Sequence, residues 1–128
     1  MKCYKIVRVK KRKNGERYFS FWAGDGAKVE YKIGEYVGTP DWLKKQGYYL
    51  TVFENIKTLK QYAKKRNLEP ELFRYFICDC EEKVNLPRIA GYVDYIKHGI
   101  LVLSKYHAEW PRGTRMFKKV KLIKEIEL

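Results

Sequence analysis

An Asn-Gly pair at positions 14 and 15 is the feature that most constrains how this chain folds, because strand-like residues stand on both sides of it. Residues 4–11 are rich in β-branched side chains, and residues 17–22 are rich in aromatic ones. Asn and Gly both tolerate the positive φ that a type I′ hairpin turn demands. We therefore predict an antiparallel hairpin at the start of the fold, with Asn14 and Gly15 at its tip.

The rest of the chain contains further strand patterns and one clear helix pattern. Apolar residues recur at helical spacing over residues 56–63, between a candidate N-cap, Asn55, and a candidate stop, Asn67. We predict a loop at residues 34–47 and further strands at residues 28–32, 48–53, 75–84, 100–103 and 116–126. The predicted class is α+β, a mostly antiparallel sheet with one principal helix, in a single small domain over residues 1–128.

Basic side chains outnumber acidic ones, with 28 Lys and Arg against 15 Asp and Glu. Residues 1–66 hold most of the surplus, 17 against 6, and 11 Tyr, 6 Phe and 3 Trp are spread through the chain. Arg and Lys neutralise phosphate, and aromatic faces stack on bases. The composition therefore fits a polynucleotide or a small nucleotide equally well. So many aromatic side chains also predict a subunit interface, and hence a homo-oligomer.

Nothing in the sequence predicts a membrane segment or export. The longest uncharged apolar run, residues 99–104, is far shorter than the roughly 20 residues of a membrane span, and the first residues lack the apolar stretch of a signal peptide. Three cysteines without a repeated spacing fit a reducing compartment. We expect a cytoplasmic protein, with Cys78 and Cys80 as small apolar residues on the inner face of a strand.

No catalytic or metal-binding group can be assembled from the sequence. His98 and His107 stand beside turn signals, without a Ser or Cys nucleophile nearby in the chain. Glu81 and Glu82 are adjacent on a predicted strand, so their side chains would point to opposite faces. Glycine-rich phosphate-binding loops are absent from the sequence. We therefore expect no enzyme, no cofactor and no metal ion.

The strongest candidate for a ligand site is the turn that precedes the last predicted strand: Trp110, Arg112, Gly113, Thr114 and Arg115. Backbone amides freed at a glycine turn, beside guanidinium groups, suit a phosphate, and Trp110 offers a stacking surface. The alternative is a turn whose arginines pair with surface carboxylates. A second candidate places an arginine among aromatic residues: Phe73, Arg74 and Phe76.

Three segments, in chain order, are similar to a pattern found in small phage proteins. They are V-x-Y-x-x-G-E over residues 29–35, an aromatic-rich strand at 48–53 before a helix, and P-x-G-T at 111–114 before a closing K-L strand. On these motifs the chain resembles the phage Thoeris anti-defence sponge family. Such proteins sequester cyclic ADP-ribose signals made by TIR-domain immune enzymes without degrading them, and some also hold cyclic oligonucleotides.

The resemblance implies α+β subunits assembled into dimers or a hexamer, with small cyclic nucleotide signals held between subunits by arginines and aromatic residues. The P-x-G-T match extends this role to Arg112 and Arg115, whereas Phe73, Arg74 and Phe76 rest on their chemistry alone. A loose similarity of residues 4–8 to ADP-ribosyltransferases lacks the downstream acidic motif.

Two other classes of function stay open. One is a nucleic-acid-binding protein that uses the basic hairpin tip, residues 10–13, and the basic outer face of the helix. The other is a structural or interaction protein of a phage. Added salt separates a polynucleotide from one small dianion, because a polynucleotide releases many more counterions on binding.

Overall fold

The computed structural model describes residues 1–21, 28–87, 91–98, 100–106 and 110–128. The strands that it contains are β1 (Lys2–Arg12), β2 (Gly15–Ser20), β3 (Glu30–Tyr31), β4 (Tyr36–Val37), β5 (Leu50–Phe53), β6 (Phe73–Val84), β7 (Gly91–Lys97), β8 (Ile100–Tyr106) and β9 (Thr114–Ile126). The helices are α1 (Asp41–Lys44) and α2 (Ile56–Arg66).

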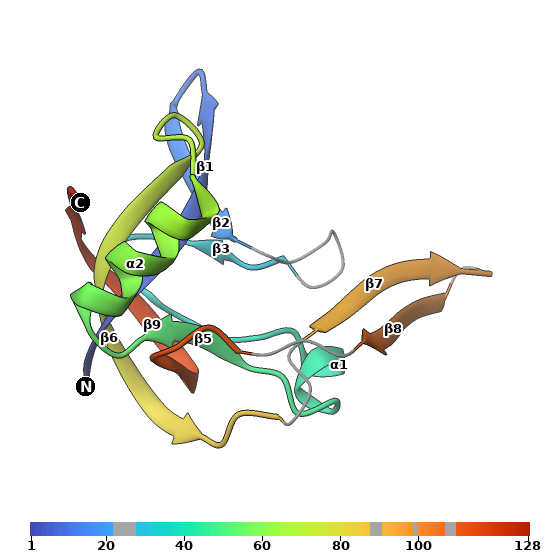
Figure 1. Ribbon diagram of the computed structural model, residues 1–128. Helices are drawn as coiled ribbons and strands as arrows, with labels where there is room; N and C mark the ends of the chain where they lie inside the picture. The colour runs from blue at the N-terminus through green and yellow to red at the C-terminus, as the bar shows by residue number, and fades with distance from the viewer. Residues whose placement is uncertain (22–27, 88–90, 99, 107–109) are drawn as a thin grey trace.

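The main sheet closes on itself as a small barrel (Figure 1). Strand β1 pairs with β6, β6 with β9, and β9 with β5, all antiparallel. A single pair of residues, Tyr4 opposite Phe53, joins β5 back to β1 and closes the ring. Strands β2 and β3 extend the sheet from β1, and β4 pairs with β9. The predicted α+β class with a mostly antiparallel sheet is confirmed.

Alternation along the long strands decides which side chains fill the barrel. The inner face of β6 contributes Phe76, Cys78 and Cys80, all of them buried, as the sequence predicts. Val120 and Leu122 of β9 are fully buried in the same cluster. Burial of these side chains removes apolar surface from water at about 25 cal/mol per Å², which is the main favourable contribution to folding.

Helix α2 covers the outside of the barrel and packs against β1 and β5. Its Leu59 is fully buried in a second apolar cluster with Ile6, Phe53 and Phe73. The predicted caps are confirmed: the Asn55 side chain accepts a hydrogen bond from the Thr58 N–H at 2.9 Å, and Asn67 ends the helix with a left-handed φ of 51°.

The first hairpin is confirmed, but its turn differs from the predicted one. Arg12 pairs with Gly15, so the two loop residues are Lys13 and Asn14. Gly15 takes a positive φ of 116°, whereas Asn14 does not have a positive φ. The type I′ prediction, with Asn14 and Gly15 both left-handed, is therefore wrong. The flanking strands set the register one residue earlier, and only the glycine then needs the left-handed region.

Two segments contain elements that the sequence patterns do not predict. Residues 34–47, expected as a loop, include the two-residue strand β4 and the four-residue helix α1. Strand β8 contains the predicted strand at 100–103, whereas its partner β7 has no counterpart in the predictions; the two form a separate two-stranded sheet that extends away from the barrel (Figure 1). With two and four residues, β4 and α1 are too short to show a hydrophobic period. No helix in the described ranges is long and apolar enough to cross a membrane.

Candidate ligand pocket in the barrel

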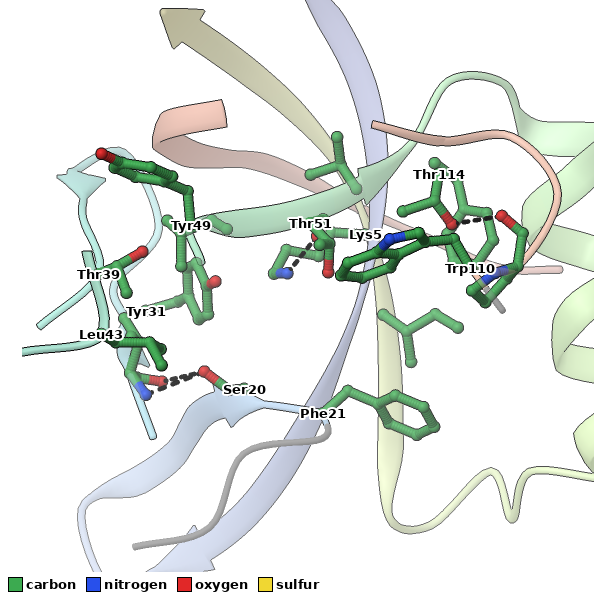
Figure 2. A pocket seen from close by; sticks show the side chains of 16 residues that line it. Lys5, Ser20, Phe21, Tyr31, Thr39, Leu43, Tyr49, Thr51, Trp110 and Thr114 are labelled. Carbon is green, nitrogen blue, oxygen red and sulfur yellow. Dashed lines mark hydrogen bonds between the residues drawn. The ribbon is translucent and has the colours of Figure 1, made fainter. Parts of the chain in front are cut away.

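A cavity of about 110 Å³ lies between β1, β5, the β2–β3 side of the sheet and the turn before β9 (Figure 2). Its lining combines one cation, Lys5, with aromatic rings and hydroxyl groups. The aromatic side chains are Phe21, Tyr31, Tyr49, Phe53 and Trp110, and the hydroxyl side chains are Ser20, Thr39, Thr51 and Thr114. A cation beside aromatic surfaces is the combination that holds an anionic or carbonyl-bearing ring.

Lys5 enters the cavity because β1 alternates. Cys3 and Val7, two residues before and after it, are fully buried inside the barrel, so Lys5 shares their face and only 7% of it is exposed. Its Nζ donates a hydrogen bond to the Thr51 carbonyl oxygen at 2.6 Å. The same nitrogen lies 5.2 Å from the centre of the Tyr31 ring, within cation–π range.

Burial lowers the pKa of Lys5 from 10.5 to about 8, because the barrel interior solvates the ammonium group poorly. The thiols that act on it electrostatically, Cys78 and Cys80, supply no negative charge at pH 7. Burial raises the pKa of Cys78 to about 12, and the hydrogen bond with Cys3 together with burial raises the pKa of Cys80. At neutral pH Lys5 is therefore mostly protonated.

In the described part of the chain, no carboxylate forms an ion pair with Lys5. An ammonium group has three donors, and one of them is used by Thr51. A buried charge without a counter-ion is costly, so such groups are usually paired. Lys5 therefore keeps hydrogen-bonding capacity and positive charge for an acceptor in the cavity.

The hydroxyl groups of the lining differ in how far they are satisfied. Ser20 Oγ accepts from the Val29 N–H at 2.9 Å, and Thr114 Oγ1 donates to the Pro111 carbonyl oxygen at 2.6 Å. Thr39 Oγ1 is buried and has no hydrogen-bond partner among the described residues. Buried hydroxyl groups normally have a partner, which marks Thr39 as a second free polar group of the cavity.

The predicted turn places two of its side chains on this cavity. Trp110 and Thr114 line it, and Trp110 is oriented by a 2.7 Å hydrogen bond from its Nε1 to the Pro87 carbonyl oxygen. Gly113 has a φ of 82° and lies against Thr58 at the start of α2. The glycine thus allows the turn to approach the helix closely and hold Trp110 at the cavity.

The two arginines of that turn lie outside the cavity lining. Arg115 pairs with Glu54 at 2.8 Å and donates to the Thr114 carbonyl oxygen at 2.9 Å. Arg112 is exposed, and the described residues form no ion pair with it. Of the two, Arg112 has the guanidinium group that is available to an anion.

The second predicted group does not come together as one site. Phe76 is fully buried inside the barrel, and Phe73 is buried on the side of α2, where its ring lies 5.1 Å from that of Phe21. Arg74 pairs with Glu16 at 3.2 Å and with Glu125 at 3.8 Å. Phe73 and Arg74 are neighbours on β6 and point to opposite faces. Phe76 shares a face with Arg74, but it is buried in the core while Arg74 is held by the two carboxylates.

Lys5 and Thr39 are the functional candidates that sequence reasoning missed. A signal for Lys5 does exist, because a lysine occupies the inward position between Cys3 and Val7 in an otherwise apolar alternation. Thr39 carries no comparable signal, since it stands in a segment without periodicity. Its place in the cavity depends on contacts between distant parts of the chain.

No protein-family model, no curated protein and no solved structure matches this chain. What the pocket binds is therefore inferred from the chemistry of its own residues.

Proposed function

We propose that this protein binds and sequesters a cyclic nucleotide-type immune signal without cleaving it, with a ring of the ligand in the barrel pocket. Cyclic ADP-ribose isomers are the first candidates, and cyclic oligonucleotides are the second. The observation that supports this most is the buried Lys5 ammonium group, which faces aromatic walls and lacks a described counter-ion.

The pocket chemistry suits part of a nucleotide. Lys5 can donate to a carbonyl, ring nitrogen or anionic oxygen, and Thr39 Oγ1, elsewhere in the same lining, can donate or accept. Trp110 provides an aromatic surface whose orientation is held by Pro87. A cavity of about 110 Å³ is comparable to the engineered cavity of roughly 150 Å³ that binds benzene, so it accommodates about one ring.

The same lining argues for sequestration and against turnover. Its titratable side chains, among the described residues, are Lys5 and the tyrosines Tyr31 and Tyr49. Neither a carboxylate nor an imidazole, the groups that most often transfer protons in catalysis, is among these lining side chains. A captured ligand should therefore be released chemically intact.

We place the protein in the cytoplasm of a phage-infected cell, as a homo-oligomer of two or six subunits. The motif resemblance supports this setting. So do Cys3, Cys78 and Cys80, which are all free thiols and suit a reducing compartment.

The test is to incubate the protein with an extract that contains TIR-derived signals, denature it by heat, and identify the released molecules by mass spectrometry. Calorimetric titration with cyclic ADP-ribose isomers then compares Lys5→Met and Trp110→Ala with Lys60→Met, a matched exposed lysine on α2. We expect the two pocket variants to lose at least tenfold in affinity and the control to be unchanged.

Three results would contradict the proposal: no released nucleotide, a cleaved product that accumulates with time, or equal affinities in all variants. The nucleic-acid alternative predicts a different pattern. The affinity for a single-stranded oligonucleotide would fall steeply with salt, because the slope of log K against log salt concentration is about −0.7 per phosphate contacted. The affinity for one small dianion should fall far less.

A further inference from the structure

An open groove of about 430 Å³ lies beside the barrel pocket, on the outer side of β1 and next to the last turn of α2. Its lining consists of three cations, Arg8, Lys65 and Arg66, and three apolar side chains, Phe21, Leu68 and Phe73. Every titratable side chain in this described lining is therefore basic. Such a groove concentrates positive potential and attracts anions.

Phe21 connects this groove to the barrel pocket, because its side chain lines both. Figure 2 shows Phe21 at the edge of the barrel pocket. The Phe21 ring lies 5.1 Å from that of Phe73 and 6.3 Å from that of Tyr62, measured between centroids. The Phe21 side chain is thus a shared wall of the barrel pocket and the basic groove.

The arginines of the groove lie against the same aromatic group. The guanidinium carbon of Arg8 is 5.6 Å from the centre of the Phe73 ring, and that of Arg66 is 5.9 Å from the centre of the Tyr62 ring. Contact with a ring restricts a long side chain, so less entropy is lost when a ligand binds. Phe21, the Phe73 and Tyr62 rings and the two guanidinium groups thus form one connected group of side chains.

Two of the three cations that line the groove belong to helix α2 and also stabilise that helix. Lys65 and Arg66 belong to the last turn of α2, where cations interact favourably with the helix dipole. Arg8 belongs to β1 and adds a third cation beside the same helix end. Neither Arg8 nor Lys65 forms an ion pair with a described carboxylate.

The volumes of the barrel pocket and the groove fit a single ligand that occupies both. Pockets that hold drug-sized ligands measure roughly 300–1,000 Å³. The barrel pocket, at about 110 Å³, is too small for a whole nucleotide, whereas the groove, at about 430 Å³, is within that range. A ligand whose ring enters the barrel must leave its phosphates outside, and Phe21 is a lining side chain that the pocket and the groove share.

We propose that Arg8, Lys65 and Arg66 bind the phosphate groups of the ligand whose ring occupies the barrel pocket. This inference rests on the proposed function and makes the site bipartite: Lys5 and Trp110 hold the ring, and the groove holds the pyrophosphate. The ligand class is accordingly a nucleotide with two linked phosphates rather than a nucleoside or a free base.

The experiment titrates three probes: adenosine, inorganic pyrophosphate and cyclic ADP-ribose. The groove variants are Arg8→Gln and Lys65→Gln, the pocket variant is Trp110→Ala, and the control is Lys60→Gln on an exposed part of the same helix. Circular dichroism first establishes that each variant is folded. Arg8, Lys65 and Lys60 are all exposed, so these substitutions should leave the fold intact.

We expect each groove variant to weaken cyclic ADP-ribose and pyrophosphate by roughly ten- to a hundredfold, the effect of losing a charge-assisted hydrogen bond, and to leave adenosine unchanged. Trp110→Ala should weaken adenosine and cyclic ADP-ribose and leave pyrophosphate unchanged. The control should behave as the parent with every probe.

The failures of the two proposals give different results. If adenosine binds and depends on Trp110, but the groove variants change nothing, the groove inference is wrong and the proposed function stands. If adenosine does not bind and Trp110→Ala has no effect, both are wrong. A single-stranded oligonucleotide that binds more tightly than cyclic ADP-ribose, with a steep salt dependence lost in the groove variants, would overturn the inference in favour of a polynucleotide site.

Discussion

The ammonium nitrogen of Lys5 lies 2.6 Å from the carbonyl oxygen of Thr51, across the interior of the barrel from β1 to β5. This hydrogen bond joins the two strands whose only paired residues, Tyr4 and Phe53, close the ring. Main-chain carbonyls can hydrogen-bond the ammonium group but cannot neutralise it. The charge therefore lowers the stability of the empty protein and is compensated when an anionic or carbonyl-bearing ligand is bound.

Replacing Lys5 by methionine should stabilise the protein while weakening ligand binding. The lowered pKa corresponds to about 3 kcal/mol of unfavourable burial at pH 7, and loss of the hydrogen bond to Thr51 offsets part of it. We expect the free energy of unfolding in urea to rise by about 1–2 kcal/mol. A variant that is less stable than the parent would contradict the view that Lys5 is retained for binding.

The stability of the parent protein should depend on pH in a way that the Lys5→Met variant does not share. The pKa of Lys5 is about 8 in the folded chain, against 10.5 as its ordinary value. Above pH 8 the unfolded state therefore holds more protons than the folded state, and the free energy of unfolding rises with pH. In urea titrations at pH 7, 8, 9 and 10, the free energy of unfolding of the parent should rise relative to that of the variant. Parallel profiles would exclude a buried lysine with a lowered pKa.

Arg112 and Arg115 should differ in their effect on ligand affinity. If the turn contacts a phosphate, Arg112→Ala should cost about 1.5–3 kcal/mol, or roughly ten- to a hundredfold in affinity. Arg115→Ala should cost less, because Glu54 already pairs with that guanidinium group at 2.8 Å. Arg112→Lys should restore binding only in part, since lysine lacks the bidentate fork. Calorimetry with cyclic ADP-ribose isomers and cyclic oligonucleotides measures this, and unchanged affinity in both alanine variants would remove these two arginines from the site.

Gly113→Ala should destabilise the protein more than Gly34→Ala does. The two glycines have nearly the same φ, 82° and 85°, so the conformational cost of alanine is similar, about 1–2 kcal/mol. A Cβ at position 113 would lie 2.6 Å from Thr58 Oγ1, whereas position 34 has no atom within 4 Å. We expect an additional loss of about 1–3 kcal/mol for Gly113→Ala in thermal or urea unfolding. Equal losses would show that the turn moves away from α2 without cost.

The protein should be larger than one 15.4 kDa chain in solution. Ile33 and Ile123 are 52% and 46% exposed, and the hydrogen bond from the Gly34 N–H to the Leu122 carbonyl oxygen brings their segments together. Exposed apolar side chains on adjacent segments favour a subunit interface. Multi-angle light scattering at micromolar concentration should give a dimer or a hexamer, and Ile123→Glu should lower the mass. A strict monomer in the parent would exclude binding between subunits.

Local signals in the sequence were enough for the elements that form from neighbouring residues. Helix α2 begins at its Asn55 cap and ends at a left-handed Asn67, because those residues satisfy backbone groups within one turn. The inner positions of β6 follow from alternation, as the burial of Phe76 and Cys78 confirms. Even the turn at Gly15 was located, although the register of its strands decided which residues form the loop.

The sequence patterns identified only part of the candidate site. Trp110 and Thr114 stand out there because a glycine turn and two arginines surround them, and both line the pocket. Lys5 and Thr39 had no such neighbours. The predicted group around Arg74 does not form one site, because Phe73 lies on the opposite face of β6, Arg74 pairs with Glu16 and Glu125, and Phe76 is buried inside the barrel.

By itself, then, the sequence determined the α+β class, the capped helix, the alternating strands and a basic, aromatic-rich chain. Only the tertiary structure decided that the sheet closes into a barrel, that Lys5 is buried beside Thr51, and that Phe21 lines both the pocket and the basic groove. The physical reason is how far apart in the chain the interacting residues are. Caps, turns and alternation depend on hydrogen bonds and packing within a few residues, whereas the pocket depends on contacts between segments that are tens of residues apart.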